Sequence, residues 1–381
     1  MRTVRQKGNE AVKKLLCLLL AAAACMGCLL LAGCSAGGGE TVMEYRGYKI
    51  TAPMYQYFSA TLKANILKAS GVKDSDEFWD TEVTDGVTAE TYYTEMLDRR
   101  VKNLCISEYL FRYYGLKLED SVKKSIEDDI NEKIEYYGGR AALNEALATL
   151  GINISILKEI YTIEEKQSAV YSYLFGDGGS MEPDDSEVEE YYRSNYSRMY
   201  YIVLYTTKPV KDSEGNYIYD TDGSWKTEQM TEEEIAAVKE KAQTLFHEAE
   251  EGDDALFVSL MKENSDFDIL TNYPNGLFVS ANEYETYGAK IVNLLGEMKP
   301  GDVRTFEESY SVWILRKLEL TEYSELSDTD IKQLSSLAAY TAQKKYTQYF
   351  DEIGKEVSVS DSVKQEYGLR RVEASRMASS V

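Results

Sequence analysis

The segment Tyr200-Tyr201-Ile202-Val203-Leu204-Tyr205 decides the fold class of this chain. Its aromatic, β-branched and aliphatic residues form a short continuous apolar run, which is typical of a buried β-strand. From residue 53 to residue 196, apolar side chains instead recur every three or four positions, which predicts a series of helices. We therefore expect an α+β fold in which a mainly helical part precedes a part built around strands.

The helical part starts with residues 42–51, where two short β-prone runs flank Gly47 and predict a hairpin. A polar loop is expected over residues 71–88, after the first helix. The acidic, serine-containing tail 358–381 is expected to be loosely ordered. The helices are predicted over about 53–70, 89–114, 120–137, 140–150, 153–175, 182–196 and 327–353.

An insertion follows the strand predicted at residues 200–205. Residues 207–230 contain the turn signals Gly215-Asn216 and Asp222-Gly223 on either side of a β-prone run, which predicts an inserted hairpin. The segment Asp220-Thr221-Asp222-Gly223 is reminiscent of a calcium loop, but the alternating acids before it and the closing Glu are missing. We interpret this segment as a turn. Two further helices are predicted over about 232–250 and 254–263.

Residues 1–33 have the pattern of a secretory signal, because five basic residues precede an uncharged apolar run from Leu15 to Gly33. The run ends in Leu31-Ala32-Gly33-Cys34, and a Gly-rich tether, residues 34–41, follows. This box resembles the bacterial lipoprotein signal. The resemblance implies lipidation of Cys34 and anchoring on the extracytoplasmic face of the cell membrane. A plain transmembrane anchor is the alternative, since about 19 apolar residues could nearly span a bilayer.

The charge balance excludes one class of partner. The chain has 42 basic and 65 acidic residues, a net charge of −23. Removal of residues 1–33 would take away five bases and one acid and leave a net charge of −27. Nucleic-acid binding requires basic faces that neutralise phosphates, so we expect no nucleic-acid partner.

The counts of histidine and cysteine limit the chemistry of the chain. His247 is the single histidine, so one chain cannot build a metal site from two or three histidines. A Ser-His-Asp or Cys-His site would have to use this residue, which lies on an amphipathic helix and is expected at its surface. Once Cys34 carries lipid, Cys105 would be the one free thiol of the exported part, and its apolar neighbours predict a small core residue.

Several further segments match motifs that occur together in one known group of proteins. Met298-Lys299-Pro300-Gly301-Asp302-Val303 resembles the Leu-Lys-Pro-Gly-Glu-Ile motif of parvulin domains. Ser311-Val312-Trp313-Ile314-Leu315-Arg316 resembles the last strand of these domains, and Tyr200-Tyr201-Ile202-Val203-Leu204 stands where they have their first. Tyr191-Tyr192-Arg193-Ser194-Asn195 resembles the helix that leads into the domain. Over about residues 42–353, the chain is similar to foldases of the PrsA and SurA type.

The resemblance implies a mainly helical chaperone domain, residues 42–197, completed by residues 326–357. A parvulin-like α/β domain, residues 198–322 with the insert 207–230, would be inserted into it. Proteins of this type bind unfolded or newly secreted polypeptides. Their parvulin domains accelerate rotation about X-Pro bonds, for which the barrier to peptide rotation is about 18–20 kcal/mol. This chemistry needs no cofactor and no metal.

The family's catalytic network consists of two histidines and a Cys or Asp. The two histidine positions correspond here to Tyr201 and Trp313, and the third position falls on Phe267, next to Asp266. The resemblance therefore makes Tyr201 and Asp266 the candidate catalytic residues. Because both histidines are replaced, we expect weak or absent isomerase activity. The resemblance assigns five residues to the proline-binding pocket, namely Tyr201, Phe267, Leu277, Phe278 and Trp313.

Two interpretations of this domain stay open. In the first, it retains residual isomerase activity through shape and desolvation, with the Tyr201 hydroxyl in the place of a histidine. In the second, it binds peptides without catalysis. An alternative from another class is a lipid-anchored solute-binding protein with no foldase role. Such proteins repeat strand–helix units, and residues 53–196 show almost no strands.

Overall fold

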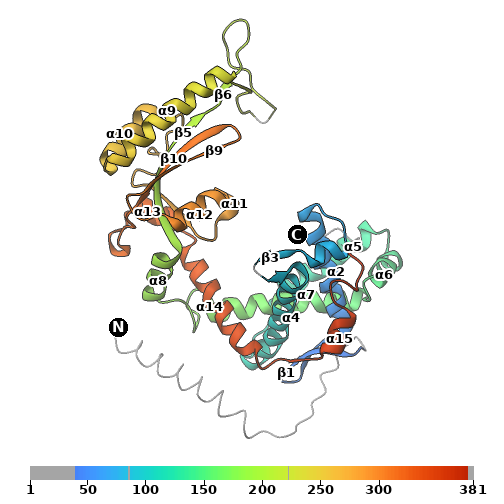
Figure 1. Cartoon of the computed structure of the whole chain (residues 1–381). Coiled ribbons are helices and arrows are strands. Elements are labelled where there is room, and N and C mark those ends of the chain that lie inside the picture. The colour runs from blue at the N-terminus through green and yellow to red at the C-terminus, as the bar shows by residue number, and fades with distance from the viewer. Residues whose placement is uncertain (1–38, 85, 222, 376–381) are drawn as a thin grey trace, which may run out of the picture. The chain divides into compact units, whose positions relative to one another are not determined.

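The computed structural model describes residues 39–84, 86–221 and 223–375 (Figure 1). The predicted signal peptide 1–33, Cys34 and most of the tether 34–41 lie outside the described residues. Within the described part, no helix is long and apolar enough to cross a membrane. The predicted α+β class is confirmed, and the chain divides into two compact units. Unit 1 holds the described residues up to Tyr173 and from Gln348 onward, and unit 2 holds Leu174–Thr347.

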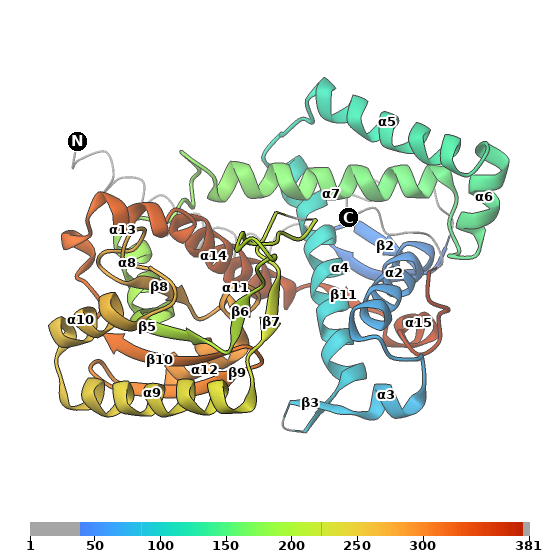
Figure 2. The ribbon, with the colours of Figure 1, turned by 90° about the horizontal axis from the view of Figure 1, so that it is seen from above.

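Unit 1 is mainly helical, as the spacing of apolar residues predicts. Helices α5 and α7 lie side by side and are joined by an ion pair between Glu127 and Lys158 (Figure 2). The elements of unit 1 are β1 (Thr41–Tyr45), β2 (Tyr48–Thr51), α2 (Ala52–Ser70), α3 (Asp76–Asp80), β3 (Glu82–Thr84), β4 (Val87–Thr88), α4 (Ala89–Tyr113), α5 (Asp120–Tyr136), α6 (Arg140–Ala148), most of α7 (Ile154–Phe175), the end of α14 (Leu337–Gly354), β11 (Ser358–Val359) and α15 (Asp361–Glu366).

The hairpin predicted over residues 42–51 is confirmed. Strands β1 and β2 pair antiparallel, and Arg46 and Gly47 both have positive φ, 50° and 89°. Such a turn matches the right-handed twist of the two strands, and glycine adopts it without steric cost. Cys105 on α4 is buried beneath this hairpin, as expected, and its Sγ donates to the carbonyl of Tyr48 at 3.1 Å.

The expectation of a polar loop over residues 71–88 was wrong, because the segment forms a helix and a hairpin. Helix α3 forms there, and the side chain of Ser75 caps it by accepting a hydrogen bond from the backbone N–H of Phe78. The indole of Trp79 is buried and donates to Asp74 at 2.8 Å, and strands β3 and β4 form a small hairpin after it. One buried aromatic ring therefore organises a segment whose polar composition is typical of a loop.

The expectation of a loosely ordered tail was also wrong for residues 358–375. Strand β11 adds to the sheet of unit 1 in the order β11-β1-β2, with Val359 paired to Met43. Helix α15 follows, and the side chains of Leu369 and Val372 are buried. Long-range packing orders this segment, and such packing leaves no local periodic signal.

Unit 2 contains a four-stranded antiparallel sheet in the order β8-β5-β10-β9. The apolar run at residues 200–205 lies in β5, the longest strand of this sheet. The elements of unit 2 are the end of α7, α8 (Asp185–Asn195), β5 (Tyr196–Tyr205), β6 (Thr207–Pro209), β7 (Thr227–Gln229), α9 (Glu232–Glu251), α10 (Asp254–Asn264), β8 (Leu277–Ser280), α11 (Tyr284–Tyr287), α12 (Ala289–Glu297), β9 (Val303–Glu308), β10 (Ser311–Leu318), the short 3₁₀ turn η1 (Tyr323–Glu325), α13 (Asp328–Gln333) and most of α14.

Helices cover both faces of this sheet (Figure 1). On one face, Arg316 of β10 donates to the carbonyl of Ala249 in α9 and pairs with Asp254 of α10 at 2.6 Å. Its neighbour Lys317 points to the opposite face, because successive residues of a strand alternate. There it donates to the carbonyl of Leu295 in α12 at 2.6 Å. Burial lowers the pKa of Lys317.

The Lys-Pro-Gly-Asp segment forms a tight turn between α12 and β9. The N–H of Asp302 donates to the carbonyl of Lys299 at 3.0 Å, and Gly301 has φ of 89°. Proline followed by a residue with positive φ is the signature of a type II turn, which explains this pair of residues. The turn leads the chain into β9, which pairs with β10.

The boundaries of unit 2 differ from the predicted domain limits 198 and 322. Helix α8 packs on the sheet through Tyr192, which contacts Phe278 of β8 at a ring distance of 6.0 Å. The expected single helix over 327–353 is divided into α13 and α14, because Leu334 leaves the helical conformation. The side chains of Leu334 and Leu337 are both part of the core that α8 covers, so α8 and α13 belong to the same unit as the sheet.

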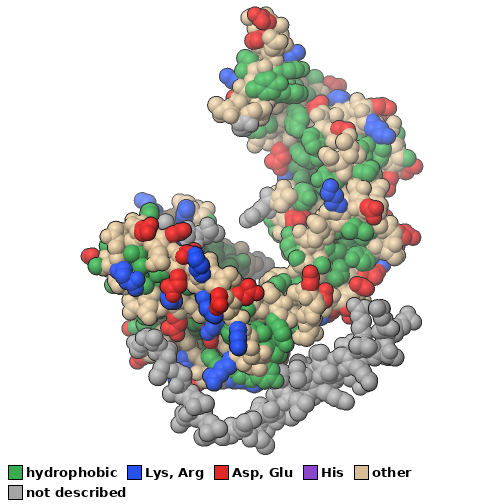
Figure 3. All heavy atoms as spheres, turned by 180° about the vertical axis from the view of Figure 1, so that it is seen from behind, with side chains coloured by type: hydrophobic (Ala, Val, Ile, Leu, Met, Phe, Trp, Pro, Cys, Tyr) green, Lys and Arg blue, Asp and Glu red, His purple; other side chains and the backbone are tan. Residues whose placement is uncertain are grey.

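The insert 207–230 forms the predicted hairpin, here called the arm. Strands β6 and β7 form its base, and the rings of Tyr217 and Trp225 stack further out, with centroids 4.8 Å apart. Lys211 lies over the ring of Tyr217 at 4.7 Å. The N–H of Gly223 donates to the carbonyl of Asp220, as expected for a turn. Figure 3 shows apolar side chains gathered on the arm, where Tyr219 is 59% exposed.

Candidate functional site

A row of three aromatic rings crosses strands β5, β10 and β9. The ring of Tyr201 lies 4.8 Å from that of Trp313, and Trp313 stacks on Phe306 at 6.1 Å with an angle of 7° between the planes. The strand register explains the row, because Phe306 is directly opposite Trp313, and Tyr201 is opposite Leu315, two residues further along β10. The two residues at the expected histidine positions therefore lie side by side.

Helix α12 closes one end of this aromatic row. The ammonium group of Lys290 lies 4.6 Å from the centre of the Phe306 ring, and it also donates to the carbonyl of Glu307 at 2.8 Å. Tyr273 and Tyr287 are half-buried and pack against the same core as Trp313. The site thus consists of packed apolar rings, of which Tyr201 and Phe306 are 8% exposed and Trp313 is half-buried, together with phenol hydroxyls and one ammonium group.

The Tyr201 hydroxyl is the candidate polar group of the site. Burial, together with the neighbouring hydroxyls of Tyr205, Tyr273 and Tyr287, raises the pKa of Tyr201 to about 12. At neutral pH the phenol therefore keeps its proton, so it can donate a hydrogen bond but cannot act as a base.

Asp266 has a structural partner instead of the Tyr201 hydroxyl. Its carboxylate accepts a hydrogen bond from the backbone N–H of Tyr205 at 2.7 Å, and its own N–H donates to the carbonyl of Val203 at 2.9 Å. Together with Ser265, whose hydroxyl accepts from the N–H of Val203, it satisfies backbone groups at the open edge of β5. These contacts of Asp266 stabilise the end of strand β5.

Phe267 lies outside the aromatic row. Its side chain is 45% exposed and lines a hollow of about 530 Å³ between α10 and the loop that follows it. Met261, Ile269 and Pro274 line the same hollow, whereas Tyr201 and Trp313 do not. The structure therefore offers two separate apolar surfaces where the sequence predicts one pocket.

Leu277 and Phe278 point to different cores. Leu277 belongs to the main core of the sheet, together with Tyr201. Phe278 belongs to the smaller core under α8 and α13, with Tyr192. Adjacent residues of a strand face opposite sides of a sheet, so these two side chains cannot line the same pocket.

His247 lies on the surface of α9, as expected, and its side chain is 65% exposed. Its Nε2 is 2.9 Å from Nε2 of Gln243. This contact does not involve the aromatic row. Among the described residues, no three His, Cys, Asp or Glu side chains are grouped so that they could hold a metal ion.

Sequence reasoning missed Phe306 and Lys290 as members of the site. A usable signal exists for Phe306, because Ser309-Tyr310 forms a two-residue turn between β9 and β10. Counting back from that turn places Phe306 opposite Trp313. No comparable local signal exists for Lys290, which arrives from a helix whose position depends on tertiary packing.

Comparison with known proteins gives distant likenesses. No family model matches the chain, and no curated protein matches it. Among solved structures, the chain is similar to the foldase protein PrsA from Streptococcus pneumoniae, with 16% identity over 77% of this chain and 100% of that one, and a TM-score of 0.24. The PrsA structure from Lactococcus lactis is 13% identical over 86% of this chain and 98% of that one, with a TM-score of 0.27. The PrsA structure from Bacillus subtilis is 17% identical over 77% of this chain and 98% of that one, with a TM-score of 0.21.

Proposed function

We propose that this chain is a membrane-anchored extracytoplasmic folding factor that binds non-native secreted polypeptides. In this proposal Cys34 carries the lipid anchor, and the sheet of unit 2 is a parvulin-type domain that binds proline-containing segments with weak or no catalysis. The motifs at residues 191–195, 200–204, 298–303 and 311–316 support the parvulin assignment.

The aromatic row is the observation that carries the proposal. A proline ring is apolar and compact, and flat aromatic surfaces are suited to hold it. Tyr201 and Trp313 occupy the two positions where the family has histidines, and their rings are in contact. This contact supports the assignment of Tyr201 and Trp313 to the apolar half of a proline site, with the half-buried ring of Trp313 as the part that a peptide would contact.

Weak catalysis is expected because the polar half of that site is changed. With a pKa of about 12, the Tyr201 hydroxyl stays protonated at neutral pH, so it offers a hydrogen-bond donor and no base. The carboxylate of Asp266 accepts a hydrogen bond from the backbone N–H of Tyr205. A twisted X-Pro amide would thus find desolvation and one donor, instead of a hydrogen-bonded histidine network.

The antiparallel sheet of unit 2 bears on the alternative function. Solute-binding proteins repeat strand–helix units that form parallel sheets. In the part of the chain that the structure describes, each pair of strands is antiparallel. The alternative of a lipid-anchored solute-binding protein therefore gains no support from the architecture.

An isomerisation assay with a proline peptide and the full exported chain tests the proposal. We expect the peptide to bind, and its isomerisation rate to stay close to the uncatalysed rate. Binding should weaken at least tenfold in Trp313→Ala. Tyr310→Phe is the matched control for Tyr201→Phe, because Tyr310 lies on the nearby turn and is 61% exposed.

A rate clearly above background that falls in Tyr201→Phe and not in Tyr310→Phe would show that catalysis survives. Asp266→Ala is a poor test of catalysis, since it removes the acceptor for the N–H of Tyr205. For the folding role, the full exported chain should suppress aggregation of a chemically unfolded protein. If it neither suppresses aggregation nor binds the proline peptide, the proposed function is wrong.

A further inference from the structure

Residues 361–375, here called the strap, run over unit 1 as helix α15 followed by an irregular segment. Helix α15 packs against β1 and α2. Two strap side chains are almost completely covered, Leu369 at 1% and Val372 at 7% exposure. The strap therefore lies on unit 1 as a short helix and a turn, in which the N–H of Val372 donates to the carbonyl of Gly368 at 3.2 Å, with two apolar anchors.

The backbone of the strap is held by α2. The ammonium group of Lys63, which is 2% exposed, donates to the carbonyl of Val372 at 2.9 Å. The N–H of Ser375 donates to the carbonyl of Ala60 at 3.0 Å. A backbone carbonyl that accepts from a buried cation is a contact that does not depend on the side chains of the peptide.

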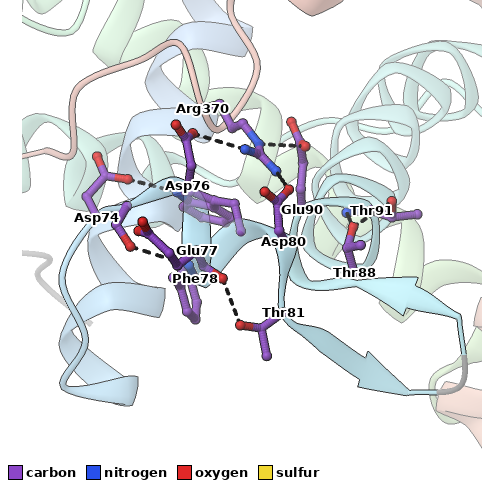
Figure 4. Close-up of polar contacts among 12 residues, drawn as sticks. Asp74, Asp76, Glu77, Phe78, Asp80, Thr81, Thr88, Glu90, Thr91 and Arg370 are labelled. Atoms are coloured by element: carbon purple, nitrogen blue, oxygen red, sulfur yellow. Dashed lines mark hydrogen bonds and ion pairs between the residues drawn. The ribbon is translucent and has the colours of Figure 1, made fainter.

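Charge complements these contacts (Figure 4). The guanidinium of Arg370 pairs with Asp76 at 3.0 Å, with Glu90 at 2.7 Å and with Asp80, carboxylates that come from α3 and the start of α4. Figure 4 shows the three acids converging on this one side chain. Near the start of the strap, Lys364 pairs with Asp98 of α4.

The surface under the strap, here called the strap site, thus recognises a definite pattern. It takes two apolar side chains, a basic side chain beside one of them, and a backbone carbonyl. The carboxylates around Arg370 are exposed, from 41% for Glu90 to 87% for Asp76. Exposed ion pairs are individually weak and are screened by salt, so the contacts of Arg370 with these carboxylates can break and re-form, whereas the pair of Lys364 and Asp98, 22% and 17% exposed, is screened less.

From these contacts we infer that the strap site is a polypeptide-binding site, and that residues 361–375 are its resident, displaceable occupant. The ligands are short segments of non-native proteins that can form such a turn and in which a basic residue lies next to apolar ones. The inference rests on the proposed folding role, because it names the class of client segment that unit 1 takes. The acidic rim of the site matches basic segments and disfavours acidic ones.

The test uses the full chain and a labelled synthetic peptide with the sequence of residues 361–375. Arg370→Glu places a fourth carboxylate among Asp76, Asp80 and Glu90 and should release the strap. Arg371→Glu is the matched control, because it makes the same charge change at the exposed neighbouring residue. Hydrogen exchange reports whether the strap is released, and fluorescence anisotropy reports peptide binding.

We expect amide exchange of residues 367–375 to rise at least tenfold in Arg370→Glu, while exchange in α4 is unchanged. The labelled peptide should bind Arg370→Glu at least tenfold more tightly than it binds the unsubstituted chain or Arg371→Glu. A peptide that itself carries Arg370→Ala should bind at least tenfold more weakly. A strap that stays protected, or a released strap whose site does not bind the peptide, would overturn the inference.

Salt keeps the inference testable if Arg370→Glu fails to fold. In the unsubstituted chain, exchange in the strap should rise between about 0.05 and 0.5 M NaCl, because the Debye length shrinks, while exchange in α4 stays constant. Strap exchange that does not depend on salt would contradict a displaceable ionic attachment. Neither measurement uses the isomerase or aggregation assays, so failure here is distinguishable from failure of the proposed function.

Discussion

The rings of Tyr201 and Trp313 lie 4.8 Å apart on neighbouring antiparallel strands, at an angle of 41°. This contact continues to Phe306, so that removal of the central ring separates the two outer ones. The row is both a part of the core and the surface that we propose for proline binding. Trp313 is half-buried, and its indole N–H donates to Ser311 at 2.8 Å.

Substitution of Trp313 should therefore affect stability as well as binding. For Trp313→Ala we expect the free energy of unfolding to fall by about 2 kcal/mol, less than the roughly 3–5 kcal/mol typical of a fully buried ring. Trp225→Ala on the arm is the matched control and should change it by less than about 0.5 kcal/mol. Urea unfolding followed by circular dichroism measures both. Equal losses would contradict the different burial of the two rings.

The buried ammonium group of Lys63 depends on Asp74, 2.6 Å away. Breaking a buried ion pair costs about 3–5 kcal/mol, but Asp74 is 44% exposed, so for Asp74→Asn we expect a loss of about 2 kcal/mol. Glu82→Gln, at an exposed position of β3, should change little. Urea unfolding at pH 7 tests this. A loss no larger than that of Glu82→Gln would mean that Lys63 needs no counterion.

The same pair predicts a dependence on pH. Burial by itself would raise the pKa of Asp74, but hydrogen bonds from Lys63 and Trp79 and the charge of Lys63 outweigh it and hold the pKa below the ordinary value of 3.8. The contribution of Asp74 to stability is therefore fully present above pH 3.8 and is lost as the pH falls through the lowered pKa. The difference between Asp74→Asn and the unsubstituted chain should shrink only below that pH. Unfolding midpoints at pH 7, 5 and 3 measure it, and a difference that already shrinks between pH 7 and 5 would contradict the assignment.

Cys105 should react slowly with thiol reagents in the folded protein. Burial raises the pKa of its thiol to about 12, and the side chain is 1% exposed. The thiolate is the reactive form, so labelling at pH 8 should be at least about a hundredfold slower than in urea. Tyr310→Cys, at an exposed turn, supplies the fast reference. The measurement uses a Cys34→Ser background. Rapid native labelling of Cys105 would show that the hairpin above it opens readily.

Anchoring can be tested at Cys34, which lies outside the described residues. We expect Cys34→Ser to move the exported chain from the membrane fraction to the soluble fraction and to abolish incorporation of labelled fatty acid. Cys28→Ser, within the predicted signal, should leave both unchanged. Membrane retention of Cys34→Ser without fatty acid would favour the alternative of a transmembrane anchor.

Local patterns predict much of this fold. The helices of unit 1, the hairpin turning at Arg46 and Gly47, the strand at residues 200–205 and the arm all follow from periodicity and turn chemistry. These features depend on residues a few positions apart, so a single sequence contains their full signal. Period-two alternation also predicts that Leu277 and Phe278 face opposite sides, a consequence that the family resemblance obscured.

Tertiary structure alone decided the features that bear on function. The strap is ordered because it contacts residues that are far from it in sequence. Lys63 donates a hydrogen bond to the carbonyl of Val372, and Asp76 and Glu90 form ion pairs with Arg370. In the same way, the role of Asp266 was settled by which backbone edge it lies beside, and Lys290 reaches the ring of Phe306 because α12 packs against the sheet. Contacts of this kind arise from packing between distant segments, and composition and spacing carry no record of which segments will meet.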